Sequence, residues 1–269
     1  GRALSEAEYT ISEGIRDGRL SQYSYHPFFT TLDQDEFEEY HELTLRISQL
    51  GNENDDDWIR QSENQEIKNI LLNKRADVIK KARNKIRTYK DVIQDNPKTP
   101  YIVFADDNSQ LDELKIAHKE IIYEINQNSV KILKDDILVF SGNTEPSERK
   151  IILEQTVGQK TPIFAMYCLD EGIDVPEFNA AILVSSSRSN RQYIQRRGRI
   201  LRKAKREQIA QLYDIVVFPP KQEQAGKNEI AISVVAKEFE RVSELSSDAI
   251  NKHEALRLFD EKKHRQGFH

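Results

Sequence analysis

From Pro97 onward, short apolar runs alternate with segments of helical character. The apolar runs are Tyr101 to Ala105, Ile137 to Phe140, Ile163 to Ala165, Ala180 to Val184 and Leu212 to Phe218. Runs of this length are typical of strands that are buried on both faces, and helices between them are typical of a parallel sheet. The pattern therefore predicts an α/β fold with helices on both faces of a parallel sheet. In such sheets ligands bind beyond the carboxyl ends of the strands, so we expect the chemistry in the segments that follow these runs.

The part of the chain before the first run is predicted to be mostly helical. Residues 23–29 form an extended aromatic stretch. Asp33 and Glu36 have the spacing of a helix N-cap and its capping-box partner, which predicts a helix that ends near Leu50. A polar, acidic loop follows at residues 51–57.

A second helix is predicted beyond this loop, because apolar residues recur with a helical period over residues 67–89. It is expected to be one long amphipathic helix with a basic outer face. The basic residues are Lys68, Lys74, Arg75, Lys80, Lys81, Arg83, Lys85 and Arg87. Such a face could follow nucleic-acid phosphates, but a solvated face that keeps the helix soluble is the commoner interpretation.

These patterns divide the chain into three expected parts. Residues 1–95 form a mostly helical N-terminal segment, residues 96–225 form the sheet domain, and residues 226–269 form a C-terminal helix that packs on it. The final helix is expected from about Ile230 to Lys262. The pattern is already under way at Gly1, so we expect the sequence to be a piece of a longer chain.

Composition restricts the classes of function. The net charge of -5 and the pI near 5.8 argue against a protein that binds nucleic acid through bulk positive charge, so any such contact is expected to be local. The single cysteine, Cys168, excludes an intramolecular disulfide and a cysteine-rich zinc site, which favours a reducing, cytoplasmic compartment. No apolar run approaches the roughly 20 residues that span a bilayer, so no membrane role is expected.

The motifs of a self-contained ATPase are missing. The phosphate-binding loop G-x-x-x-x-G-K-[ST] is absent, because Gly226-Lys227 is followed by asparagine and lacks the earlier glycine. The acidic pairs Asp112-Glu113 and Asp170-Glu171 do not end an apolar strand, so neither has the context of a magnesium-binding pair. The glycine-rich dinucleotide, serine hydrolase and zinc protease motifs are also missing. We therefore do not expect this chain to hydrolyse ATP by itself.

The densest chemical signal is a predicted helix over residues 193–202. Gln195, Arg199 and Arg202 fall at positions i, i+4 and i+7, which places them on one face. Gly198 on the neighbouring face would allow the helix backbone to approach the sheet closely. Arginine is always charged and binds phosphate in a bidentate manner, so this face suits a phosphoryl group. The alternative is a surface helix whose arginines form salt bridges with acidic loops.

A second signal follows the predicted strand at residues 163–165. In the stretch from Leu169 to Pro176, Gly172 permits a tight backbone path and Asp174 could accept hydrogen bonds from a ribose or orient an arginine. Aspartate and glycine are common in turns after strands, so this segment alone is weak.

In order and spacing, these segments resemble the motifs of superfamily 2 helicases. Leu169 to Pro176 resembles motif V, and Gln195 to Arg202 resembles motif VI, with its pattern Q-R-x-G-R-x-x-R. Tyr101 to Ala105 resembles motif IV, and Phe140-Ser141-Gly142 with Arg149 resembles the strand, turn and helix between motifs IV and V. The amino-acid sequence of motif V is most similar to that of the branch of repair helicases and type III restriction translocases.

This resemblance covers roughly residues 97–218 and implies the second, RecA-like lobe of a DEAD/DEAH-type motor. It implies that Arg199 and Arg202 are catalytic arginine fingers for ATP held on a first lobe. Gln195 would contact the phosphates or the partner lobe, while Gly172 and Asp174 would face the nucleotide or couple it to the nucleic acid. The N-terminal third resembles, more loosely, the segment that leads out of the first lobe.

The resemblance also implies the partners of the lobe. Ser141, Gly142 and Arg149 would lie near the backbone of a nucleic acid, with DNA favoured over RNA. ATP and Mg²⁺ would be bound mainly by the first lobe, which belongs to the same full-length chain, and no metal is expected in this chain alone. Met166 stands where many relatives have a threonine that contacts phosphate, and a thioether cannot donate that hydrogen bond.

Two other classes of function remain as alternatives. One is a stand-alone module that binds nucleic acid or protein without ATPase function, which the missing nucleotide loop favours but the two aligned arginines do not. The other is an unrelated enzyme acting on a small metabolite, for which no nucleophile, base or metal cluster is apparent. His118, His253 and His264 are expected at the surface.

Overall fold

The computed structural model contains one six-stranded, all-parallel sheet in the order β1-β6-β5-β2-β4-β3. It describes residues 11–17, 21–50, 58–96, 101–128, 137–140, 145, 147–148, 151–152, 161–166, 180–185, 209–221 and 228–268. The strands are β1 (Tyr23–Thr31), β2 (Tyr101–Phe104), β3 (Leu138–Phe140), β4 (Ile163–Ala165), β5 (Ala180–Leu183) and β6 (Ala210–Phe218). The five apolar runs predicted as strands are confirmed as β2 to β6, and the aromatic stretch is confirmed as β1.

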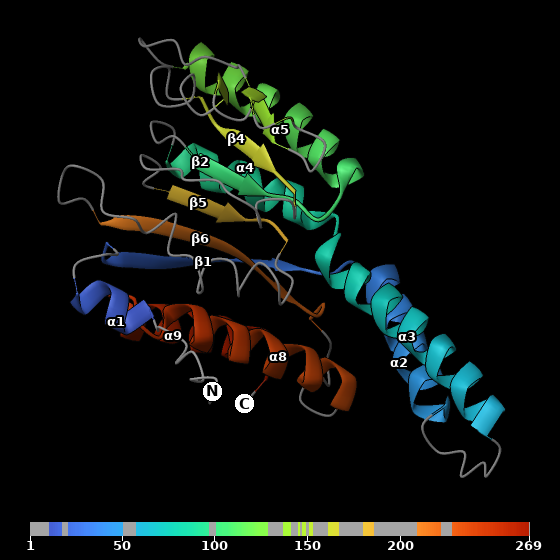
Figure 1. Ribbon diagram of the computed structural model, residues 1–269. Coiled ribbons are helices and arrows are strands. Elements are labelled where there is room, and N and C mark those ends of the chain that lie inside the picture. The colour runs from blue at the N-terminus through green and yellow to red at the C-terminus, as the bar shows by residue number, and fades with distance from the viewer. Residues whose placement is uncertain are drawn as a thin grey trace, which may run out of the picture.

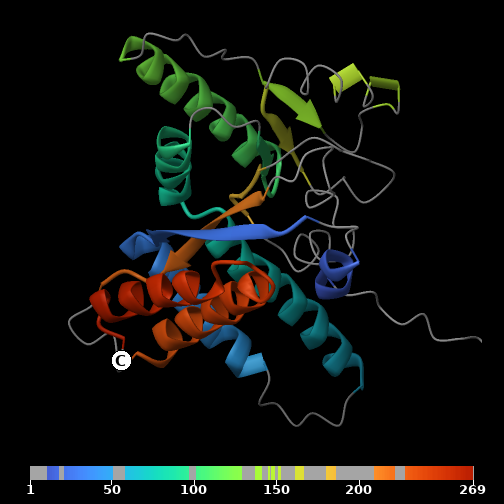
Figure 2. The ribbon, with the colours of Figure 1, turned by 90° about the vertical axis from the view of Figure 1, so that its left-hand side faces the viewer.

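Helices cover both faces of the sheet, as predicted (Figures 1 and 2). The helices are α1 (Ile11–Arg16), α2 (Gln34–Leu50), α3 (Trp58–Lys80), α4 (Asn84–Asp95), α5 (Asn108–Gln127), α8 (Glu229–Ser246) and α9 (Lys252–Arg265). Helices α4 and α5 pack on one face and α8 and α9 on the other. The sheet has a hydrophobic core on each face, one beneath α4 and α5 and one beneath α8 and α9. Because side chains alternate along a strand, Tyr101 and Val103 of β2 belong to the core beneath α4 and α5, while Ile102 and Phe104 belong to the core beneath α8 and α9.

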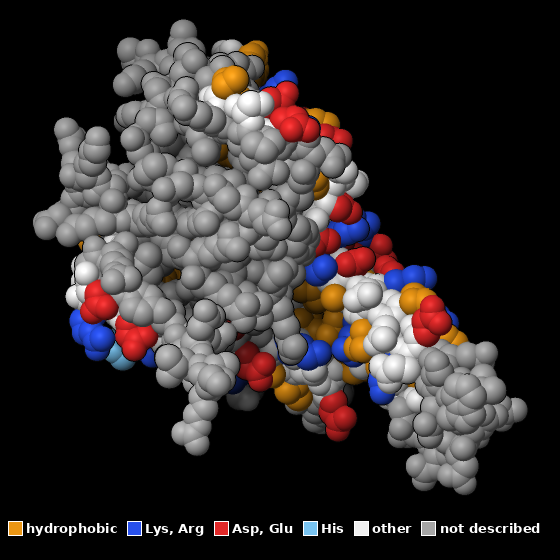
Figure 3. All heavy atoms as spheres, in the orientation of Figure 1, with side chains coloured by type: hydrophobic (Ala, Val, Ile, Leu, Met, Phe, Trp, Pro, Cys, Tyr) orange, Lys and Arg blue, Asp and Glu red, His pale blue; other side chains and the backbone are white. Residues whose placement is uncertain are grey.

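Helices α2 and α3 pack against each other and project from the body, and we call this pair the arm (Figure 1). The predicted start of α2 is confirmed, because the Asp33 backbone N–H donates a hydrogen bond to the Glu36 carboxylate at 2.8 Å. Leu45, Ile67 and Ile70 of the arm are exposed hydrophobic residues. Figure 3 shows hydrophobic side chains beside charged ones on the arm.

The prediction of one long helix over residues 67–89 is wrong. Helix α3 ends at Lys80 and α4 begins at Asn84. Tertiary hydrogen bonds hold this break: the Arg83 backbone N–H donates to Glu36 at 2.9 Å, and the Asn84 side chain donates to the Thr31 carbonyl at 2.9 Å. A break of three residues hardly disturbs the helical period of the apolar positions, so the pattern alone did not reveal it.

The predicted single C-terminal helix is also two helices, α8 and α9. Between them, the Asn251 side chain accepts a hydrogen bond from the Tyr25 N–H and donates one to the Tyr25 carbonyl, both at 2.9 Å. Tyr25 lies on β1, an edge strand whose outer backbone groups need partners. The amide of Asn251 therefore takes the place of a neighbouring strand, and the chain must bend to bring it there.

Within the described ranges, every helix is too short or too polar to cross a bilayer.

Candidate functional site

The sheet brings the beginnings of two motif-bearing segments to one edge. Strand β2 lies between β5 and β4, and Phe104 is in register with both Leu183 and Ala165. All three strands are parallel, so their carboxyl ends share an edge. Motif V comes shortly after Met166 at the end of β4, and the segment that contains motif VI follows Ser185 at the end of β5. Both segments therefore begin at the carboxyl edge of the sheet.

The predicted site residues themselves lie outside the described residues. They are Ser141, Gly142, Arg149, Gly172, Asp174, Gln195, Arg199 and Arg202. Their roles stay predictions, and the described residues around them form the edge of the sheet where these segments begin.

Met166 is half-buried and packs against the hydrophobic core on the side of α4 and α5. This position, which resembles the threonine position of motif V, therefore carries an apolar side chain that contributes to packing. It offers no hydroxyl to a phosphate.

Three groups distant in sequence meet at the carboxyl edge, and we call them the Ser185 junction: Ser185, the Gln110 side chain and the Lys80 carbonyl. Ser185 Oγ lies 2.5 Å from the Lys80 carbonyl oxygen and 2.9 Å from Gln110 Oε1. Gln110 Nε2 donates to the same carbonyl at 2.9 Å. Ser185 and Gln110 are both buried. The end of α3, the start of α5 and the end of β5 are thus joined through polar side chains.

Ion pairs surround this junction where the end of α3 meets the start of α5. Lys80 Nζ lies 3.2 Å from Asp106, and Lys81 Nζ lies 2.6 Å from Asp107. Lysines at a helix C-terminus and aspartates at a helix N-terminus both complement the helix dipoles. The hydrogen bond to Asp107 raises the pKa of Lys81. Burial opposes ionisation of Asp107, but hydrogen bonds from the Gln110 N–H and from Lys81 outweigh it and lower the pKa of that carboxyl.

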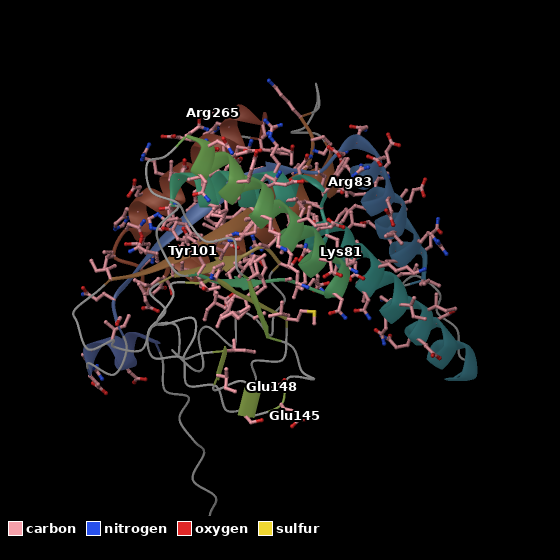
Figure 4. The ribbon with its side chains drawn as sticks, turned by 90° about the horizontal axis from the view of Figure 1, so that it is seen from above. Lys81, Arg83, Tyr101, Glu145, Glu148 and Arg265 are labelled. Carbon is pink, nitrogen blue, oxygen red and sulfur yellow. The ribbon has the colours of Figure 1, made fainter. Side chains whose placement is uncertain are left out.

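Arg83, in the break between α3 and α4, forms ion pairs with acidic residues at the start of α2 (Figure 4). Its guanidinium lies 3.1 Å from Asp33 and 3.4 Å from Glu36, and it also forms an ion pair with Asp35. The Arg83 side chain is 57% exposed, so each pair contributes little alone. Together with the buried junction, however, these contacts hold the start of α2 and the end of α3, which form the base of the arm, at the sheet.

A buried ionic cluster lies beneath this edge. Arg241 of α8 forms ion pairs with Asp214 at 3.3 Å and Glu238 at 2.9 Å. Lys85 of α4 is also buried and donates from Nζ to the Val184 carbonyl at 2.8 Å. Burial lowers the pKa of Lys85 to about 7; Arg241 lowers it too, while Glu238 and Asp214 raise it. Of these groups, Lys85 binds the backbone of the residue that immediately precedes Ser185.

The basic face predicted for residues 67–89 needs correction at Lys85. This lysine is 1% exposed and belongs to neither a solvated nor a phosphate-binding face. Lys81 and Arg83 are exposed, as predicted, but they are in ion pairs with acidic residues of this chain. A signal was available in the sequence, because Lys85 lies four residues before Tyr89 and so shares the apolar face of α4.

The prediction that His118 lies at the surface is wrong. His118 is 2% exposed, and its Nδ1 forms a 2.8 Å hydrogen bond with the Tyr89 hydroxyl. The reason is its position on α5, on the same face as the buried Leu114 and Ile121. His253 and His264 are exposed, as predicted. Among the described residues, no group of His, Cys, Asp or Glu could hold a metal ion.

Comparison with known families identifies the domain. Residues 84–204 match the family described as the helicase conserved C-terminal domain. This match supports the predicted C-terminal lobe of a superfamily 2 helicase. This helicase lobe is 26% identical over 203 residues to "DNA 3'-5' translocase XPB2" of Sulfurisphaera tokodaii, a match that covers 71% of this chain and 42% of that protein. The chain thus spans less than half the length of the curated relative that it matches.

The fold of the helicase lobe has a solved counterpart. The crystal structure of the C-terminal part of the Fun30 ATPase domain is 13% identical, with a TM-score of 0.51, and the match covers 93% of this chain and 100% of that one. At this identity the similarity shows the fold alone. Together with the six-stranded parallel sheet, it confirms the predicted RecA-like α/β class.

Proposed function

We propose that this helicase lobe is the second motor lobe of an ATP-dependent nucleic-acid translocase, and that Arg199 and Arg202 are its arginine fingers. The observation that carries the proposal is the match of residues 84–204 to the helicase C-terminal domain. The order of the strands supports it, because the segments with motifs V and VI both begin at the carboxyl edge of the sheet. That edge is where parallel α/β sheets bind ligands.

The chemical role of the two arginines follows from their charge and geometry. A guanidinium that binds the γ-phosphate neutralises charge that develops during phosphoryl transfer, and such a finger raises the rate by roughly 10³ to 10⁵. Gln195 contacts the phosphates or the first lobe. Gly172 and Asp174 face the nucleotide or couple it to the nucleic acid. ATP and Mg²⁺ are held mainly by a first lobe of the full-length chain.

The nucleic-acid track is gripped through its phosphates. Ser141, Gly142 and Arg149 contact the backbone, so the lobe has little base specificity. DNA is the favoured track, since the relative from Sulfurisphaera tokodaii is named a DNA translocase. Closure of the two lobes around ATP and their opening after hydrolysis change the distance between two gripping surfaces, which produces stepping.

The test is ATP turnover by this lobe joined to the first lobe, with and without DNA or RNA. Arg199→Ala and Arg202→Ala are compared with Arg87→Ala, which removes an exposed arginine on α4. We expect either finger variant to lose nucleic-acid-stimulated turnover by roughly 10³ or more while it still binds ATP, and the control to keep it. The lobe alone should not turn over ATP.

A binding module without ATPase function is the second candidate, favoured by the missing phosphate-binding loop. Turnover that is indifferent to both arginines, with nucleic-acid binding retained, would support it and overturn the finger assignment.

A further inference from the structure

We propose that Ser185 and Gln110 are positioning residues that couple the arm to the segment that carries Arg199 and Arg202. This inference rests on the proposed function, because it concerns where the arginine fingers are held. In it, the carboxyl end of α3, the start of α5 and the end of β5 move as one body, so a change in the orientation of the arm shifts the point at which the segment with the fingers begins.

The hydrogen bonds at the Ser185 junction are specific in direction. The Asp106 backbone N–H donates to Gln110 Oε1 at 2.9 Å, which fixes the orientation of the amide and leaves its Nε2 to donate to the Lys80 carbonyl. Ser185 Oγ lies within hydrogen-bond distance of Oε1 and of that carbonyl. A hydroxyl has one proton, so Ser185 donates to one of these acceptors at a time.

The Lys80 carbonyl is in the last turn of α3, where helix carbonyls lack partners within the helix. Ser185 and Gln110 therefore cap α3 from outside. The cap is buried, so a group left without its partner there costs more than one at the surface. This makes the end of α3 dependent on the position of Ser185.

The arm is long enough for its base to matter. Helix α3 has 23 residues, and at 1.5 Å per residue it is about 35 Å long. A small rotation at Lys80 therefore displaces the far end of the arm by several times more than the base. The ion pairs of Lys80 with Asp106 and of Lys81 with Asp107 oppose separation of α3 from α5.

Among the described residues, Ser185 also makes the last backbone hydrogen bond between the end of β5 and β2. The backbone N–H groups of Val184 and Ser185 both donate to the Phe104 carbonyl, each at 3.2 Å. Beyond Ser185 the chain leads to motif VI. One residue thus holds the sheet through its backbone and the arm through its side chain, immediately before the segment with the fingers.

The experiment uses the full-length protein with Ser185→Ala and, separately, Gln110→Glu, which keeps the shape of the side chain but removes the Nε2 donor. Ser246→Ala is the matched control. It removes another buried serine hydroxyl, whose Oγ lies 3.5 Å from the Ser243 carbonyl oxygen. The preceding residue, Leu245, accepts a hydrogen bond from the Tyr23 hydroxyl at the amino end of β1, so Ser246 also lies close to the sheet but far from the junction in sequence. The measurements are thermal unfolding, kcat and KM for ATP with nucleic acid, and ATP consumed per nucleotide travelled.

We expect each junction variant to lower the stimulated kcat by about tenfold and to raise the ATP consumed per nucleotide, with KM for ATP nearly unchanged. Ser246→Ala should lower the melting temperature less, because its contact is longer, and should leave the coupling ratio unchanged. A purely structural role predicts that the coupling ratio stays unchanged in all three variants, and that result overturns the proposal. If one junction variant fails to fold, the other decides.

Dependence of turnover on Arg199 tests the proposed function, and the coupling ratio of the junction variants tests the coupling. If wild-type turnover does not depend on Arg199, the proposed function is wrong and the coupling proposal is wrong with it. If turnover depends on Arg199 but the junction variants couple normally, only the coupling proposal is wrong.

Discussion

Lys85 Nζ and the Val184 carbonyl oxygen are 2.8 Å apart in the buried interior, so a lysine hydrogen-bonds the backbone at the carboxyl end of β5. The lysine faces Arg241, Glu238, Asp214 and Asp106. Burial, the largest influence, lowers its pKa to about 7 from the ordinary 10.5. A lysine held in this way makes the stability of the lobe depend on pH.

The sign of this dependence is set by which state binds the proton. Between about pH 7 and 10.5 the unfolded chain keeps the proton of Lys85 and the folded chain releases it, so the free energy of unfolding rises with pH in that window. We expect Lys85→Met to be more stable relative to wild type below pH 7 than at pH 9. Urea unfolding at several pH values measures the difference.

Lys119→Met is the control for this prediction, because Lys119 is exposed on α5. A difference between wild type and Lys85→Met that stays constant from pH 6.5 to 9 would contradict the lowered pKa.

Arg241→Met should destabilise the lobe strongly. Arg241 is 4% exposed and, besides its two ion pairs, donates to the Ile215 carbonyl at 3.0 Å. Its removal leaves Asp214 and Glu238 buried without their cation, a change that costs about 3 to 5 kcal/mol. Arg257→Met, which breaks an exposed pair with Glu261, should cost under about 1 kcal/mol. Similar unfolding free energies for the two variants would refute the importance of the buried cluster.

Asn251→Ala should loosen the edge of the sheet at β1. It removes two hydrogen bonds to the Tyr25 backbone, and we expect a loss of about 1 to 3 kcal/mol in unfolding free energy. Hydrogen exchange of the Tyr25 amide should accelerate, because its acceptor is the Asn251 side chain. Asn73→Ala, at an exposed position on the arm, should leave this amide protected. Unchanged exchange in Asn251→Ala would show that another group protects β1.

Much of the fold could be predicted because buried strands have a recognisable local sequence pattern. Apolar runs buried on both faces, such as Ile163 to Ala165, are recognisable without knowledge of their neighbours, and parallel order follows from the helices between them. The helicase class was predicted separately, from the resemblance of motifs IV, V and VI to those of a known family. The residues of the nucleotide and nucleic-acid sites, Arg199 and Arg202 included, were predicted by resemblance and lie outside the described residues.

The sequence by itself therefore determined five strands of the parallel sheet and, through its resemblance to helicase motifs, the RecA-like class. The tertiary structure decided that β1 joins this sheet beside β6. Only the tertiary structure decided that α3 ends at Lys80, that Lys85 and His118 are buried, and that Ser185 meets Gln110. The physical reason is that hydrophobic period depends on neighbours within a few positions. A helix break or a buried polar group depends on hydrogen-bond partners supplied by distant parts of the chain, as Glu36 does for Arg83 and Val184 for Lys85.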